Sequence, residues 1–167
     1  EEIKQKITSQ RDSIKDILQS KKTVYGINTG FGKLSSVRIS EENLSKLQVN
    51  LIRSHACGVG DPLTSEITRA LLITRLHTLS LGATGISLQC VDRILFLLKN
   101  NFLPRIPEKG SVGASGDLAP LSHLALAVLG EGEVLIDNKW VETSSVLPSS
   151  KMCRNVEVVK FDVLLLY

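Results

Sequence analysis

Apolar residues recur every three to four positions in five stretches of this chain, with polar residues between them. Such spacing places the apolar side chains on one face of a helix, so it predicts five amphipathic helices. Clusters of glycine and proline separate these stretches. The chain is therefore predicted to be mainly α-helical, with short strands and glycine-rich loops. The predicted helices cover residues 3–18, 40–55, 64–79, 87–98 and 120–129.

Residues that favour helix ends mark several of these boundaries. Ser40 is followed by two glutamates, and we expect its hydroxyl to accept a backbone amide of the first turn. Thr64 or Ser65 is expected to cap the third helix, and Ser87 the fourth. Pro120 suits a first helical turn, where a missing amide hydrogen costs nothing. Glycines are expected to close the third and fifth helices, namely Gly82, Gly85 and Gly130.

The segments between the helices are predicted to be extended or turned. Asp61-Pro62 is expected to break the chain between the second and third helices. Two prolines favour an extended backbone over residues 102–109. Residues 134–136 and 140–141, joined by residues 137–139, are predicted to form a small hairpin.

Composition and charge exclude several classes of protein. The formal net charge is +3, from 20 basic and 17 acidic residues, and aromatic residues make up 4%. A nucleic-acid surface of basic and stacking side chains is therefore not expected. No apolar run approaches the ~18 residues that cross a membrane, so no membrane partner is expected. Cys57, Cys90 and Cys153 form no C-x-x-C pair, which favours reduced thiols in a cytoplasmic protein.

Residues 110–124, GSVGASGDLAPLSHL, contain a loop that could react with itself. Gly116 has no Cβ, so its amide nitrogen can approach the Ala114 carbonyl at backbone angles closed to other residues. Attack there closes a five-membered ring. Loss of water, including the Ser115 hydroxyl, then leaves an electron-poor methylene. No ordinary side chain is an electrophile, so such a loop would supply one without an external cofactor or a metal.

Other interpretations of the glycine-rich loops are weaker. A nucleophile elbow needs glycine where Asp117 stands, and a phosphate loop needs glycine where Ile27 stands. An isolated Ala-Ser-Gly also fits an ordinary helix-entry loop in which Ser115 hydrogen-bonds to the backbone. Asp117 either orients the loop or accepts amides at the helix start.

Three motifs in the same order carry a resemblance to a known family. Residues 110–124 resemble the signature of the histidine and phenylalanine ammonia-lyase family, whose prosthetic group, 4-methylidene-imidazol-5-one (MIO), forms from Ala-Ser-Gly. Residues 24–32, VYGINTGFG, resemble its tyrosine loop. Residues 50–60, NLIRSHACGVG, resemble its substrate-selectivity segment. The resemblance covers roughly residues 1–143 and implies the N-terminal part of an ammonia-lyase-like helical fold.

The resemblance also implies roles for single residues. Ala114, Ser115 and Gly116 are the implied MIO precursors. Tyr25, or a partner carboxylate beyond this sequence, is the implied base for the β-proton. The Ser54-His55 pair resembles the version of the family that acts on L-histidine. The physical reason is that an imidazole can hydrogen-bond another imidazole. A packed Tyr25 and a solvated His55 at a helix end are the structural alternatives.

The implied reaction removes ammonia from L-histidine and gives trans-urocanate, in a homotetramer whose active sites combine residues of different subunits. The alternatives are an ammonia-lyase or aminomutase acting on phenylalanine or tyrosine, and a non-catalytic product that associates with full-length subunits. The chain opens on Glu1 without an initiator methionine, and we expect a fragment that is inactive alone.

The last part of the chain departs from the family pattern. After about residue 144 a Ser/Pro-rich stretch is followed by an apolar end. Residues 1–143 are therefore expected to be the N-terminal part of a lyase domain carrying the MIO loop, and residues 144–167 a divergent tail from truncation, splicing or a frameshift.

Overall fold

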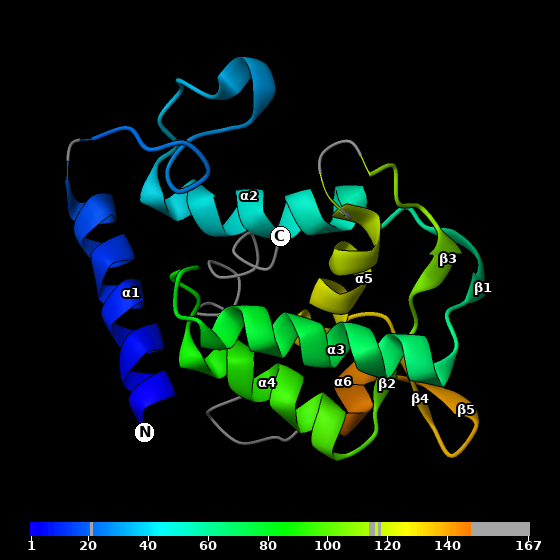
Figure 1. Cartoon of the computed structure of the whole chain (residues 1–167). Coiled ribbons are helices and arrows are strands. Elements are labelled where there is room, and N and C mark those ends of the chain that lie inside the picture. Colours follow the sequence, from blue (N-terminus) through cyan, green and yellow to red (C-terminus); the bar gives the residue numbers. More distant parts are fainter. Residues whose placement is uncertain (21, 114–115, 117, 148–167) are drawn as a thin grey trace.

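Helices dominate the computed structural model, which describes residues 1–20, 22–113, 116 and 118–147 (Figure 1). The prediction of a mainly helical fold with short strands is confirmed. The helices are α1 (Glu2–Gln19), the short 3-10 turn η1 (Gly32–Leu34), α2 (Glu41–His55), α3 (Ser65–Ser80), α4 (Leu88–Lys99), α5 (Leu118–Leu129) and α6 (Thr143–Val146). The strands are β1 (Val59–Pro62), β2 (Leu103–Pro104), β3 (Pro107–Lys109), β4 (Glu133–Ile136) and β5 (Lys139–Glu142).

The predicted caps of the third and fourth helices are confirmed. The Thr64 hydroxyl accepts a hydrogen bond from the Ile67 amide at 3.4 Å, at the start of α3. The Ser87 hydroxyl accepts one from the Cys90 amide at 3.3 Å, at the start of α4. Each bond satisfies an amide that has no partner within its own helix.

Two other helix starts differ from the expectation. Ser40 stands at the N-cap of α2, but its hydroxyl accepts from the Asn43 side-chain amide at 2.9 Å and not from the backbone. Our expectation for the Ser40 hydroxyl was therefore wrong, because a side-chain donor one turn further on occupies the same oxygen. Helix α5 begins at Leu118, two residues before Pro120. The proline still falls in the first turn, where amides have no intrahelical partner.

One apolar core connects α1 to α5. Helix α3 lies against α4 across the middle of the molecule, and α1 packs on both (Figure 1). Helix α5 contacts α4 and α2, so it joins this group to α2. The buried core includes Ile7, Val49, Ile52, Leu72, Leu79, Ile94, Leu124 and Val128. Burying each such large apolar side chain contributes about 1.5–3 kcal/mol.

Two small antiparallel sheets lie at one side of the helices. Strand β1 pairs with β3, with Val59 opposite Lys109 and Pro62 opposite Pro107. Strand β4 pairs with both β2 and β5. Asp61-Pro62, which we expected to break the chain, lies inside β1. The proline is tolerated because both strands of a two-stranded sheet are edges, where one amide can be missing.

The predicted hairpin is confirmed with a tighter turn. Val134 lies opposite Val141, and Ile136 opposite Lys139. Only Asp137 and Asn138 remain in the turn, with φ of 47° and 62°. Two successive residues with positive φ match the twist of the flanking strands in a two-residue hairpin loop.

The structure also bears on the predictions about membrane spans, cysteines and the end of the chain. Over the ranges described, no helix has both the length and the hydropathy needed to cross a bilayer. Among the described residues, Cys57 and Cys90 are not joined in a disulfide. Cys153 lies outside the described residues, as does the predicted tail from residue 148 onward. Before it, residues 143–146 form α6, and the boundary at residue 143 stays a prediction.

Candidate active site

The three segments predicted to form the site lie around helix α2. Residues 22–40 precede the helix and lie above its first half, whereas Ser54 and His55 end it (Figure 1). Strand β1 begins shortly after His55 and pairs with β3, which leads directly into residues 110–117. Antiparallel pairing of β1 with β3 therefore brings the segment just after α2 next to Gly110, where the predicted loop begins.

Gly116 is the one residue of the Ala-Ser-Gly tripeptide that the structure describes. Ala114, Ser115 and Asp117 lie outside the described residues. Gly116 has φ of 85°, and apart from its chain neighbours no described atom lies within 4 Å of the position that a Cβ would take. Only glycine adopts such a φ readily. The cyclisation stays a prediction.

His55 is half-buried at the end of α2, and its Nδ1 faces the preceding turn of the helix. His55 Nδ1 lies 2.8 Å from the Leu51 carbonyl oxygen and 3.1 Å from Ser54 Oγ. Ser54 Oγ itself donates to the same carbonyl at 2.7 Å. Because a carbonyl oxygen only accepts, the short contact requires a proton on Nδ1. In the neutral ring, Nε2 is then a hydrogen-bond acceptor.

Tyr25 lies in a turn that precedes η1. Its side chain is 63% exposed, and its ring meets Phe31 edge to face, with 5.7 Å between the ring centroids. The turn is built around the buried Asn28. Asn28 Oδ1 accepts from the Val24 amide at 2.8 Å, and Asn28 Nδ2 donates to the Lys22 carbonyl at 2.9 Å.

The structure does not bring all the predicted site residues together. Among the described residues, no hydrogen bond or ring contact joins Tyr25 to Ser54, His55 or Gly116. Ser54 and His55 share the end of α2, one strand pair away from the loop. The arrangement therefore unites the predicted selectivity residues with the loop region and leaves the predicted base on its own segment.

One histidine outside the predicted set links the end of α2 to α5. His123 Nε2 accepts a hydrogen bond from the Gly58 amide at 3.1 Å. Burial lowers the pKa of His123 below its usual 6.5, which favours the neutral ring. An imidazole nitrogen that accepts from an amide carries no proton, so the ring proton is on Nδ1.

The backbone around this histidine is packed too closely for side chains. A Cβ on Gly58 would lie 3.0 Å from His123 Nε2 and 3.1 Å from Pro107 Cβ. A Cβ on Gly110 would lie 3.0 Å from the Gly58 Cα and 3.1 Å from Ala119 Cβ. Glycine at both positions therefore lets β1, β3 and the start of α5 meet. The sequence motifs gave no sign of these glycine contacts.

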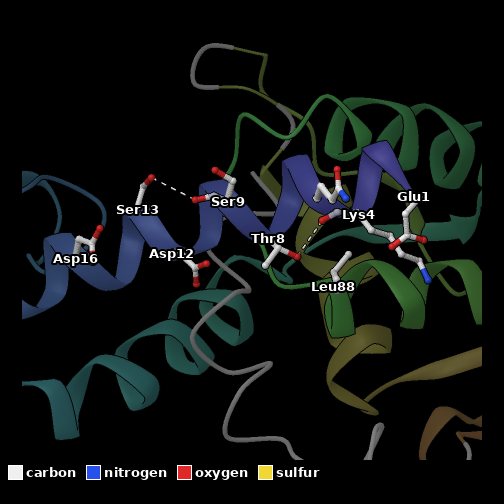
Figure 2. Close-up of a pocket in the computed structure, with 9 residues that line it drawn as sticks. Glu1, Lys4, Thr8, Ser9, Asp12, Ser13, Asp16 and Leu88 are labelled. Carbon is white, nitrogen blue, oxygen red and sulfur yellow. Dashed lines mark hydrogen bonds between the residues drawn. The ribbon is translucent and has the colours of Figure 1, made fainter.

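Two clefts in the described part of the chain lie away from the predicted residues. One of about 430 Å³ lies between α3, β3 and α5, and the half-buried Arg75 is in its lining. Another of about 670 Å³ follows α1, where Figure 2 shows carboxyl and hydroxyl groups along the helix. Thr8 and Ser13 there hydrogen-bond carbonyls of their own helix. Neither cleft is lined by Tyr25, Ser54 or His55.

Comparison with known proteins gives one consistent family. A model of the aromatic amino acid lyase family matches residues 1–158. The chain is 46% identical over 147 residues to histidine ammonia-lyase of Staphylococcus saprophyticus, covering 88% of this chain and 30% of that protein. It is 50% identical over 143 residues to histidine ammonia-lyase of Bacillus cytotoxicus, covering 86% and 28%. The chain thus spans about three-tenths of the length of these relatives.

Solved structures share the fold over the same region. Histidine ammonia-lyase from Trypanosoma cruzi superposes with a TM-score of 0.78 and 44% identity, over 88% of this chain and 28% of that one. Phenylalanine aminomutase of Pantoea agglomerans gives 0.81 and 28% identity, over 87% and 28%. The predicted ammonia-lyase-like fold is confirmed. The chain belongs to the aromatic amino acid lyase family.

Proposed function

We propose that this chain is part of a histidine ammonia-lyase, which converts L-histidine to trans-urocanate and ammonia. The relatives named above support histidine as the substrate, since the two curated ones and the Trypanosoma structure carry that name at 44–50% identity. The observation that carries the proposal is the fixed ring of His55, whose Nδ1 lies 2.8 Å from the Leu51 carbonyl oxygen.

His55 would select the substrate by its acceptor nitrogen. With the proton fixed on Nδ1, Nε2 accepts a hydrogen bond from the imidazole N–H of L-histidine. A phenyl ring has no such donor, and a site polar group left without its partner penalises that substrate. Ser54 shares the Leu51 carbonyl with the His55 ring and so helps to hold its orientation.

Residues 114–116 would provide the prosthetic group of the family. Once formed, MIO supplies an electrophilic methylene that makes the substrate amine a better leaving group. The chain's own contribution includes Gly116, which has no Cβ to shield the amide nitrogen that attacks the carbonyl two residues earlier. No metal or external cofactor is part of the proposal.

Tyr25 is the proposed base for the β-proton. Its side chain is 63% exposed and lies on a glycine-rich segment, so a substrate could reach the hydroxyl. A phenol needs neighbouring donors to lose its proton at neutral pH. We propose that these donors come from other parts of a homotetramer, together with the rest of the substrate pocket. The cytoplasmic location stays a prediction from the cysteine content.

An aminomutase or lyase for phenylalanine or tyrosine is the alternative within the family. The Pantoea agglomerans phenylalanine aminomutase shares the fold with a TM-score of 0.81, but at 28% identity. The Ser54-His55 pair favours a substrate side chain that can donate a hydrogen bond. We therefore propose histidine and keep phenylalanine as the comparison substrate in each test.

The test uses a hybrid enzyme, in which the 147 aligning residues of this chain replace their counterpart in the Staphylococcus saprophyticus histidine ammonia-lyase. We expect the peptide containing residues 110–124 to have lost two water molecules by mass spectrometry, and the protein to release urocanate from L-histidine. The matched variant Ser115→Ala should keep the peptide unmodified and abolish turnover. An unmodified peptide in a folded parent hybrid would refute the proposal.

A further inference from the structure

His123 lies where the predicted selectivity segment meets the helix that follows the loop. Its ring projects from α5 and accepts from the Gly58 amide at 3.1 Å, across 65 positions of sequence. Gly58 lies three residues after His55. A hydrogen bond at this point fixes the backbone between the end of α2 and β1.

The contacts around this hydrogen bond leave little freedom for the backbone. The position of a Gly58 Cβ lies 3.0 Å from His123 Nε2, and that of a Gly110 Cβ lies 3.0 Å from the Gly58 Cα. A methyl group at either position would crowd its neighbour, so glycine is what lets these backbones approach so closely. The ring of His123, the turn at Gly58 and the entry to the loop at Gly110 are therefore packed as one unit.

The helices on either side are held by the core. Val49 and Ile52 of α2 and Leu124 and Val128 of α5 are buried in the same cluster. Because α2 and α5 are fixed there, the His123–Gly58 bond sets the path of the short segment that joins α2 to β1. This segment follows directly after His55, the last residue of α2.

We propose that His123 is a positioning residue: by holding the Gly58 amide, it sets the orientation of the His55 end of α2 relative to Gly110, where the predicted loop begins. This inference rests on the proposed function, because it concerns how L-histidine meets His55. The ring acts as an acceptor only and takes no part in proton transfer. This role requires a neutral side chain at position 123 with a hydrogen-bond acceptor where Nε2 lies.

The hybrid enzyme tests this with three variants. His123→Leu removes the acceptor at similar volume, His123→Gln keeps an acceptor at a similar reach, and His77→Leu makes the same change on the exposed side of α3. For His123→Leu, we expect KM for L-histidine to rise about tenfold, the effect of losing one neutral hydrogen bond. We expect kcat to stay within about twofold of the parent. His123→Gln and His77→Leu should keep the parent KM.

Other outcomes overturn the inference. An unchanged KM in a folded His123→Leu protein, or an equal rise in His123→Gln, would show that the acceptor does not position the site. Should His123→Leu fail to fold, Gly58→Ala serves instead, because its Cβ would push on Nε2; a parent KM in that variant would equally refute the inference. An inactive parent hybrid with an unmodified loop peptide would instead refute the proposed function.

Discussion

At the scale of single residues, two histidines carry the ring proton on the same nitrogen and have different proposed roles. His55 Nδ1 donates to the Leu51 carbonyl, so Nε2 of the neutral ring is an acceptor, the atom proposed to meet the substrate. His123 also carries its proton on Nδ1, but its Nε2 accepts from the Gly58 amide within the fold. The position of each internal partner therefore separates the proposed binding histidine from the proposed positioning one.

Replacing His55 with leucine tests substrate choice directly. In the hybrid enzyme, we expect His55→Leu to lower kcat/KM for L-histidine by about 10- to 100-fold, the range for one hydrogen bond lost at a partly buried polar site. Turnover of L-phenylalanine, where the parent hybrid shows it, should not fall, because a phenyl ring makes no hydrogen bond to Nε2. Steady-state kinetics with both substrates measure this. An equal fall for both would remove the selective role of His55.

The buried ring of His123 predicts a pH dependence of stability. Burial lowers the pKa of His123 in the folded chain below 6.5, so on acidification the unfolded chain takes up the proton first. This contribution to stability is fully present above pH 6.5 and is lost as the pH falls toward the folded-state pKa. Urea unfolding of the chain between pH 7.5 and 5.5 measures the loss. His123→Gln should remove the part of this loss that His123 causes. An unchanged pH dependence of the free energy of unfolding in that variant would show that His123 is not responsible.

At the scale of helices and strands, close approach of backbone decides where α1 packs. A Cβ on Gly85 would lie 2.4 Å from Ile14 Cγ1, and Gly85 has φ of 70°. Arg11 also donates to the Gly85 carbonyl at 3.2 Å. Glycine at this position therefore lets the chain between α3 and α4 touch α1.

We expect Gly85→Ala to destabilise the fold by about 1–3 kcal/mol, from backbone strain and displacement of α1. Gly113→Ala is the matched control, because Gly113 has nearly the same φ, 69°, and nothing within 4 Å of its Cβ position. Gly113→Ala should show only the destabilisation that comes from backbone strain at positive φ. Chemical denaturation of both variants gives the comparison, and equal losses would mean that the contact with Ile14 contributes nothing.

The two serine N-caps provide a second comparison between elements. Ser87 accepts from the Cys90 amide, whereas Ser40 accepts only from the Asn43 side chain. We expect Ser87→Ala to lower the free energy of unfolding by about 1 kcal/mol, a typical value for a cap. Ser40→Ala should cost clearly less in the same denaturation experiment. Equal losses of unfolding free energy in the two variants would show that the hydrogen bond to the backbone amide does not set the stabilisation by the cap.

The same elements show how far sequence reasoning reaches. Helices were predictable because their apolar spacing and capping residues act within a few positions of one another. The pairing of β1 with β3 was not, since each strand is short, contains proline and meets a partner more than 40 residues away. His55 was found through its motif. The contact of Gly58 with His123 was missed because it depends on packing between α2 and α5, which no local pattern encodes.

At the scale of the whole molecule, the site residues are distributed rather than gathered. The described residues place His55 and the loop entry around one strand pair, while Tyr25 lies on the segment before α2 and makes its ring contact with Phe31. This distribution fits a chain that spans about three-tenths of its relatives.

We therefore expect the 167-residue chain to release no urocanate from L-histidine by itself, whereas the hybrid enzyme does. The reason is geometric: a base must lie within hydrogen-bond reach of the proton it removes, and among the described residues no hydrogen bond or ring contact joins Tyr25 to His55. Absorbance assays of both proteins at equal concentration, with circular dichroism to show that the chain is folded, make the comparison. Turnover by the folded chain alone would mean that the site is complete within these residues, and that Tyr25 is not held apart from His55 during the reaction.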